Sequence, residues 1–181
     1  LQQAFRMDSM SKPLHAGRAA EAGVLAAQIA RAGVTGARDV IDGDAGIGFA
    51  MSDGPDWRVA LATLGRDFHI TNMTFKAHAC CGHTFAPIDG ALALQAKLGV
   101  SADKIARLKI STYRSALEVA RYEEPETAAE ARFSLKYVVA TALTHGSVRL
   151  AAFEPERLTN PATRALMQRI ELSVDPEIDE L

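Results

Sequence analysis

The sequence is poor in cysteine, with only Cys80 and Cys81 among its 181 residues. Neighbouring cysteines rarely bridge each other and no third is present, so we expect no structural disulfide and a reducing compartment, the cytoplasm. Two thiols also fall short of the four ligands of a common iron–sulfur cluster or Cys₄ zinc site. The sequence therefore predicts a protein without a bound metal.

An excess of charge of one sign and long apolar runs are also lacking. The formal net charge of −2 argues against a general nucleic-acid binder. No apolar run approaches the ~20 residues of a membrane-spanning helix, and no secretory leader is visible, so we expect no membrane partner. Apolar residues make up 48% of the chain. That fraction indicates a globular protein with one core or two small lobes.

Chemically active side chains gather in residues 76 to 83, which contain one lysine, two histidines and both cysteines. The run 68 to 75 before this cluster predicts a strand, and the run 88 to 98 after it predicts a helix that ends at Gly99. Flanking elements hold such connections rigidly, and a helix N-terminus favours anions. The pattern indicates a carboxylate-binding and proton-transfer site at a strand-to-helix junction.

The first part of the chain predicts helices. Residues 18 to 32 are rich in alanine with one narrow polar stripe, which predicts a helix buried on most sides and stopped at Gly33. Residues 36 to 54 are rich in glycine and aspartate and predict a linker. Pro55 then begins a short helix over residues 57 to 64.

The second part mixes strands and helices. Alternating apolar residues predict strands at 108 to 112 and 170 to 174. Between them, Thr127 and Glu130 have capping-box spacing, residues 133 to 143 predict a buried helix ended by Gly146, and Asn160 precedes a further helix.

Together these elements predict an α+β fold with two parts. Residues 1–45 are expected to form the edge of an all-helical domain. Residues 46–181 are expected to form a small α+β lid domain, with helices packed on a mostly antiparallel sheet.

Three blocks carry a resemblance to a known family. They are Lys12-Pro-Leu-His-Ala-Gly-Arg-Ala-Ala20, Lys76-Ala-His-Ala-Cys-Cys-Gly-His83 followed by Ile88-Asp89, and Ala131-Arg-Phe-Ser-Leu-Lys-Tyr137. In this order they resemble the MmgE/PrpD family, which includes 2-methylcitrate dehydratase, cis-aconitate decarboxylase and iminodisuccinate epimerase. The chain departs from many members at Phe85, where they have histidine, and at residues 77 to 79, where they have Pro-Tyr-Pro.

The resemblance implies a large helical domain with a smaller lid, a homodimer, and action on di- and tricarboxylates without metal or cofactor. Family members are more than twice as long, so the chain resembles a fragment that lacks the N-terminal part of the helical domain. That missing part carries further acidic and histidine active-site residues.

The resemblance implies that Lys12 and Lys76 lie in the active site, where two cations would bind a dianion. Three positions after Lys12, His15 is a candidate substrate-binding residue. A lysine at a helix start suits a carboxylate. The alternatives are an ordinary surface lysine at 12 and a solvated strand end at 76.

Because histidine as a residue type can gain or lose a proton near neutral pH, His78 and His83 are candidate catalytic residues, the alternatives being a helix cap or a metal ligand. Tyr122 matches an active-site tyrosine loop in the family, or is an ordinary loop aromatic. Cys80 and Cys81 are candidate substrate-binding residues that we expect to pack as small side chains. Asp89 is expected to cap its helix or to orient His83.

These observations support two hypotheses of different classes. The first is a lyase or isomerase of the MmgE/PrpD type, which removes a proton α to a carboxylate while lysines stabilise the developing charge. The second is a catalytically incomplete fragment that serves as an anion-binding or dimerisation module.

Overall fold

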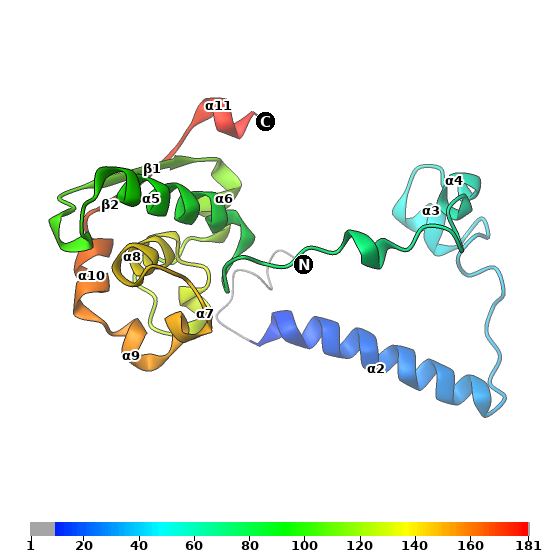
Figure 1. Ribbon diagram of the computed structural model, residues 1–181. Coiled ribbons are helices and arrows are strands. Elements are labelled where there is room, and N and C mark those ends of the chain that lie inside the picture. Colours follow the sequence, from blue (N-terminus) through cyan, green and yellow to red (C-terminus); the bar gives the residue numbers. More distant parts are fainter. Residues whose placement is uncertain (1–9, 181) are drawn as a thin grey trace. The chain divides into compact units, whose positions relative to one another are not determined.

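The computed structural model describes residues 10 to 180, which form two compact units (Figure 1). We call Pro13–Phe75 the N-terminal unit. The C-terminal unit comprises the described residues from Lys76 onward together with those up to Lys12. The domain boundary expected at residue 45 stays a prediction.

The N-terminal unit is built from helices, as the sequence predicts. Its elements are α2 (Ser11–Arg31), α3 (Ile47–Met51), α4 (Trp57–Leu61) and the 3-10 turn η1 (His69–Asn72). Helix α3 lies inside the expected linker, and the Asp56 side chain caps α4 by accepting from the backbone N–H groups of Arg58 and Val59. Gly33 follows α2 with a φ of 95°, a conformation that favours glycine.

Two predictions for this unit are wrong. Helix α2 has no buried residue, and Val24, Leu25 and Ile29 are 60%, 54% and 43% exposed, because no described element of the unit covers its apolar side. Residues 68 to 75 form no strand either. A strand needs a neighbour to satisfy its backbone, and no second strand of the unit is described, so η1 forms and Phe75 is 88% exposed.

The C-terminal unit is organised around helix α8 (Leu135–His145), which confirms the predicted buried helix. Ser134 caps its start by accepting from the backbone N–H of Tyr137, and Gly146 ends it with a φ of 79°. Eight of its residues are buried, so it is apolar on nearly all sides. Helix α5 (Phe85–Leu98), which ends at Gly99, packs against α8 through Ile88 and Ala91 (Figure 1).

The sheet has two strands, β1 (Leu108–Thr112) and β2 (Ile170–Val174), at the predicted positions. The expected antiparallel arrangement is wrong, because the strands are parallel with Ile110 opposite Leu172. All the helices from α6 to α10 lie between them in the sequence, and a long helical crossover returns the chain in the same direction. The unit is therefore α+β and mostly helical.

The remaining elements form the crossover and the end of the chain. They are η2 (Gly82–Thr84), η3 (Ala102–Lys104), α6 (Arg114–Val119), α7 (Ala128–Ala131), η4 (Leu150–Phe153), α9 (Pro155–Leu158), α10 (Pro161–Met167) and α11 (Pro176–Asp179). Both predicted caps are confirmed, the Thr127 and Glu130 capping box at α7 and the Asn160 cap at α10. Among the described residues, no helix is long and apolar enough to cross a membrane.

We expect Ile88→Ala to destabilise the C-terminal unit by about 2–5 kcal/mol, because the side chain is fully buried between α5 and the core and its loss leaves a cavity. Leu98→Ala on the same helix is the matched control, since Leu98 is 60% exposed. Its free energy of unfolding is expected to change by no more than about 0.5 kcal/mol. Urea unfolding followed by circular dichroism measures both, and equal losses would show that α5 does not pack as described.

Candidate functional site

The residue 76 to 83 cluster lies on a connection that leads through η2 into α5. Backbone hydrogen bonds hold it to both ends of α8. The Ala79 N–H donates to the Val148 carbonyl at 3.0 Å, beyond the end of α8, and the Cys81 N–H donates to the Arg132 carbonyl at 3.0 Å, before its start. The cluster is thus rigid without a preceding strand.

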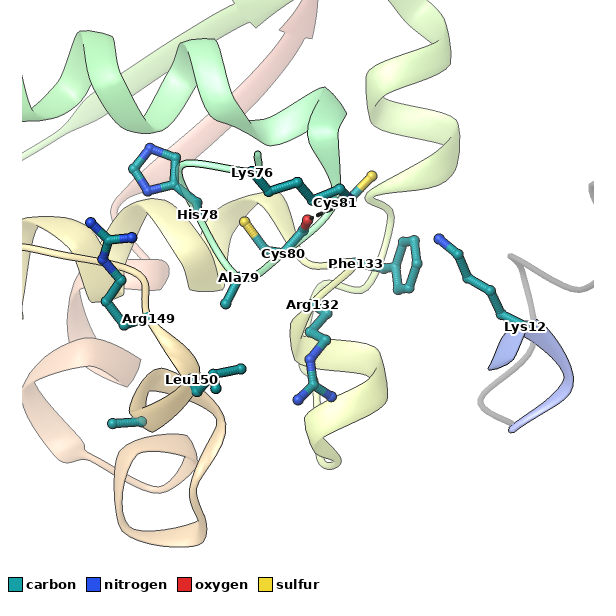
Figure 2. A pocket seen from close by; sticks show the side chains of 11 residues that line it. Lys12, Lys76, His78, Ala79, Cys80, Cys81, Arg132, Phe133, Arg149 and Leu150 are labelled. Atoms are coloured by element: carbon teal, nitrogen blue, oxygen red, sulfur yellow. Dashed lines mark hydrogen bonds between the residues drawn. The ribbon is translucent and has the colours of Figure 1, made fainter. Parts of the chain in front are cut away.

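A cavity of about 750 Å³ opens beside this connection (Figure 2). That volume is in the range of small-molecule sites. Five of its lining residues are positively charged or carry an imidazole, and no lining residue is acidic. The lining comprises Lys12, Lys76, His78, Ala79, Cys80, Cys81, Arg132, Phe133, Arg149, Leu150 and Ala151.

Three cations of this cavity, Lys76, Arg132 and Arg149, are held by neutral groups. The Lys76 Nζ donates to the Cys80 carbonyl at 3.4 Å, a bond drawn in Figure 2. Arg132 donates to the Ala128 carbonyl at 3.3 Å and stacks over the Phe153 ring at 4.7 Å. Arg149 donates to the Ala77 carbonyl at 2.9 Å. Neutral acceptors orient these charges without neutralising them, so the cavity favours an anion.

Sequence reasoning missed both arginines as site residues. Arg132 stands inside the block Ala131-Arg-Phe-Ser that was quoted for the resemblance, and its position was the available signal. Arg149 follows α8 by a few residues in an unremarkable loop, and only the fold brings it to the cluster.

His78 is buried, lines the large cavity and is paired with Asp89 on α5. Its Nε2 lies 2.9 Å from the Asp89 Oδ1. Its ring packs edge-on against the Phe85 ring, with the two centroids 5.2 Å apart. The expectation that Asp89 caps its helix or orients His83 is therefore wrong. A carboxylate only accepts, so Nε2 carries the proton, and in the neutral ring Nδ1 is the acceptor.

His83 lies at a second cavity of about 440 Å³ and is paired with Tyr113. Its Nδ1 is 2.7 Å from the Tyr113 hydroxyl, and the centroids of the two rings are 5.6 Å apart. Burial, and secondly the nearby Cys81, raises the pKa of Tyr113 above its usual value. Sequence reasoning missed Tyr113, although a tyrosine directly after the predicted strand 108 to 112 was a usable signal. Lys76 and Cys81 line both cavities.

Cys80 and Cys81 are buried free thiols that line the large cavity. The Cys80 Sγ lies 3.2 Å from the Thr84 hydroxyl, which donates to the Cys81 carbonyl at 2.7 Å. Burial raises the pKa of the Cys80 thiol by more than the Thr84 contact lowers it. Cys80 therefore behaves as a packed neutral thiol, whereas the substrate-binding role of both cysteines stays a prediction.

The other predicted site residues have different positions. Lys12 also lines the large cavity, with its Nζ 5.1 Å from the centre of the Phe133 ring. Tyr122 is half-buried under the Arg121 guanidinium and does not line either of these cavities. His15 is exposed on α2 in the N-terminal unit. The catalytic and binding roles assigned to all of these residues stay predictions.

The polar groups of the site are also a poor set of metal ligands. No group of three or more histidine, cysteine, aspartate or glutamate side chains that would hold a metal ion occurs in residues 10 to 180. His78 and His83 each have a different partner, and those partners lie on different elements.

We expect iodoacetamide to alkylate Cys80 at least about tenfold more slowly in the folded protein than in denaturant, because burial blocks access and raises the thiol pKa. A Cys81→Ser variant leaves Cys80 as the reacting thiol, and mass spectrometry follows the reaction. The denatured variant is the control. Equal rates in the two states would contradict the buried, neutral thiol.

Comparison with known proteins matches the chain to one family over two regions. A model of the MmgE/PrpD N-terminal domain matches residues 1–60, and a model of the MmgE/PrpD C-terminal domain matches residues 78–181. The chain is 26% identical to cis-aconitate decarboxylase of Homo sapiens over 175 residues, which covers 93% of this chain and 36% of that protein.

A second relative, cis-aconitate decarboxylase-like protein oryM of Aspergillus oryzae, is 27% identical over 192 residues, which covers 98% of this chain and 40% of that protein. This chain therefore spans well under half the length of these curated relatives. The C-terminal domain match alone covers more than half of the chain, and on that ground the chain belongs to the MmgE/PrpD family.

Proposed function

We propose that this chain forms the carboxylate-binding part of an MmgE/PrpD-type lyase or isomerase acting on a di- or tricarboxylate. The observation that carries the proposal is the large cavity, where Lys76, Arg132 and Arg149 converge and no lining residue is acidic. The relatives' names support the lyase class, because a decarboxylase is a lyase. They also support the substrate class, because cis-aconitate is a tricarboxylate.

The cations suit a reaction in which charge develops next to a carboxylate. Removal of an α proton leaves its electron pair on the substrate as an enolate-like dianion. Fixed positive groups stabilise that charge most when they are already oriented, and here backbone carbonyls orient them. Arginine also binds a carboxylate through two parallel hydrogen bonds, which fixes the orientation of the substrate.

We assign the proton acceptor to His78. Asp89 keeps the proton on Nε2, so the free electron pair is on Nδ1, and the ring lines the same cavity as the cations. When Nδ1 takes the α proton, the resulting imidazolium remains paired with the Asp89 carboxylate. This pairing stabilises the charged product of proton transfer.

We assign a second proton-transfer role to His83 with Tyr113, on the other side of Lys76. A phenol and an imidazole in contact pass a proton along one hydrogen bond, and this pair is half-buried. It would protonate a leaving hydroxyl or a substrate carbon. Lys12, His15 and Tyr122 remain candidates for completing the site.

The second candidate is an anion-binding or dimerisation module without turnover. The exposed apolar side chains of α2 favour it, because they leave the N-terminal unit without a buried face on that helix. This candidate predicts that di- and tricarboxylates bind and raise thermal stability but are not converted. We further propose that the protein is a homodimer in the cytoplasm and that catalysis needs no metal or cofactor. Light scattering tests the dimer, and elemental analysis tests the absence of a metal.

An activity assay separates the two candidates. Cis-aconitate, 2-methylcitrate and iminodisuccinate are offered to the 181-residue chain and, where its reading frame is longer, to the parent protein. We expect the 181-residue chain to be nearly inactive, because one wall of a site cannot exclude water or position both ends of a dicarboxylate. Binding without turnover in the parent protein as well would favour the module.

In an active parent protein, we expect Lys76→Ala to lower kcat/KM about a hundredfold, because it removes one fixed positive charge from the transition state, worth ~3 kcal/mol. Lys76 is exposed, so the melting temperature is expected to change little. Lys97→Ala is the matched control, an exposed lysine on α5 that lines none of the described cavities. Wild-type kinetics in Lys76→Ala would remove this lysine from the mechanism.

A further inference from the structure

A small cavity of about 70 Å³ lies beyond the end of α8 and shares Arg149 and Ala151 with the large one. It is lined by Thr141 and His145 of α8, Ser147 and Arg149 of the following loop, Ala151 and Ala152 of η4, and Arg157 of α9. Two of these residues are arginines and none is acidic. Organic ligands need pockets of roughly 300 Å³ or more, whereas one water occupies about 30 Å³. The volume therefore fits a monatomic ion with or without one water.

The cations of this cavity have no acidic partner. In residues 10 to 180, ion pairs join other arginines to carboxylates, but neither Arg149 nor Arg157 takes part in one. Arg149 instead donates to the Ala77 carbonyl, and Arg157 donates to the Nδ1 of His145. Arg149 and Arg157 thus both bring positive charge to the lining of this cavity without a carboxylate partner.

One of the residues that line this cavity carries a buried hydroxyl. Thr141 is 1% exposed, and its Oγ1 has no hydrogen-bond partner among the described residues. A buried hydroxyl without a partner costs free energy unless a water or an ion satisfies it. Ser147 adds a second hydroxyl to the lining.

His145 contributes a neutral ring rather than a charge. Its Nδ1 accepts from Arg157, so Nε2 carries the proton and lies 3.3 Å from the Thr163 hydroxyl. Burial, and secondly the positive charge of Arg157, lowers the pKa of His145 below its usual value. The charged groups that line the cavity are thus the two arginines.

We propose that this cavity is a binding site for a small monovalent inorganic anion, with chloride held between Arg149 and Arg157 and by the Thr141 and Ser147 hydroxyls. The site is separate from the function proposed above. Because Arg149 also lines the large cavity, bound chloride reduces the positive charge that Arg149 presents there.

The test titrates the 181-residue chain with sodium chloride against sodium gluconate at constant ionic strength. Gluconate is too large for the cavity. We expect a rise in the melting temperature that saturates with chloride, as binding to one site requires. Chloride-35 NMR line widths measure the same binding directly. A rise that is linear and equal in both salts would overturn the proposal, because it would reflect general salt effects.

Variants locate the site. Arg157→Gln is expected to weaken chloride binding at least about tenfold, the loss of one charge-assisted contact. Arg169→Gln is the matched control, since Arg169 is likewise an arginine held by neutral groups, here two backbone carbonyls, but does not line this cavity, and it should bind chloride like wild type. If Arg157→Gln does not fold, Thr141→Val, which keeps both arginines, is expected to weaken binding about fivefold. Unchanged binding in every folded variant would overturn the site.

Discussion

The site depends on two backbone hydrogen bonds that fix residues 76 to 83 to the ends of α8. One joins the Ala79 N–H to the Val148 carbonyl and the other joins the Cys81 N–H to the Arg132 carbonyl. Helix α8 is the most deeply buried helix of the unit. Hydrogen bonds to the residues that flank it therefore hold residues 76 to 83 in place, although no strand precedes them. They also explain why Arg132 and Arg149, one on each side of α8, reach the same cavity.

The positively charged side chains of the C-terminal unit have two kinds of partner, carboxylates and neutral groups. On the outer surface they are paired with carboxylates, as in Arg107 with Glu171 and Lys136 with Glu123. At the large cavity Lys76, Arg132 and Arg149 are held by carbonyl groups and a ring. A carbonyl orients a cation but leaves its full charge for a ligand, whereas a carboxylate cancels it. Arg169 is also held by carbonyls, so what distinguishes the large cavity is that three such cations line it together, which suits the proposed anion site.

The local signals of the sequence predicted most of the C-terminal unit. Gly99 and Gly146 end the expected helices, Asn160 begins another, and both alternating runs are strands. These features depend on neighbouring residues, so a single sequence contains them. Strand direction depends on the whole crossover between β1 and β2, and the predicted antiparallel sheet failed for that reason. The strand expected at 68 to 75 and the burial of α2 failed because both require a covering element.

The candidate site was predicted only in part for the same reason. The cluster of residues 76 to 83 was visible in the sequence, and so were His78 and His83. Their partners were not, since Asp89 and Tyr113 are assigned by three-dimensional contacts. Arg149 had no local signal at all, because the fold of α8 and the loop after it, and not the neighbouring sequence, brings it to the cavity.

The partners also decide what the two histidines can do. Asp89 accepts only, so it fixes the tautomer of His78. The Tyr113 hydroxyl both donates and accepts, so it leaves the tautomer of His83 open. The first arrangement suits the base that we propose for His78, and the second suits the proton carrier that we propose for His83. Lys76 lines both cavities, so in the proposed mechanism its charge is near both histidines.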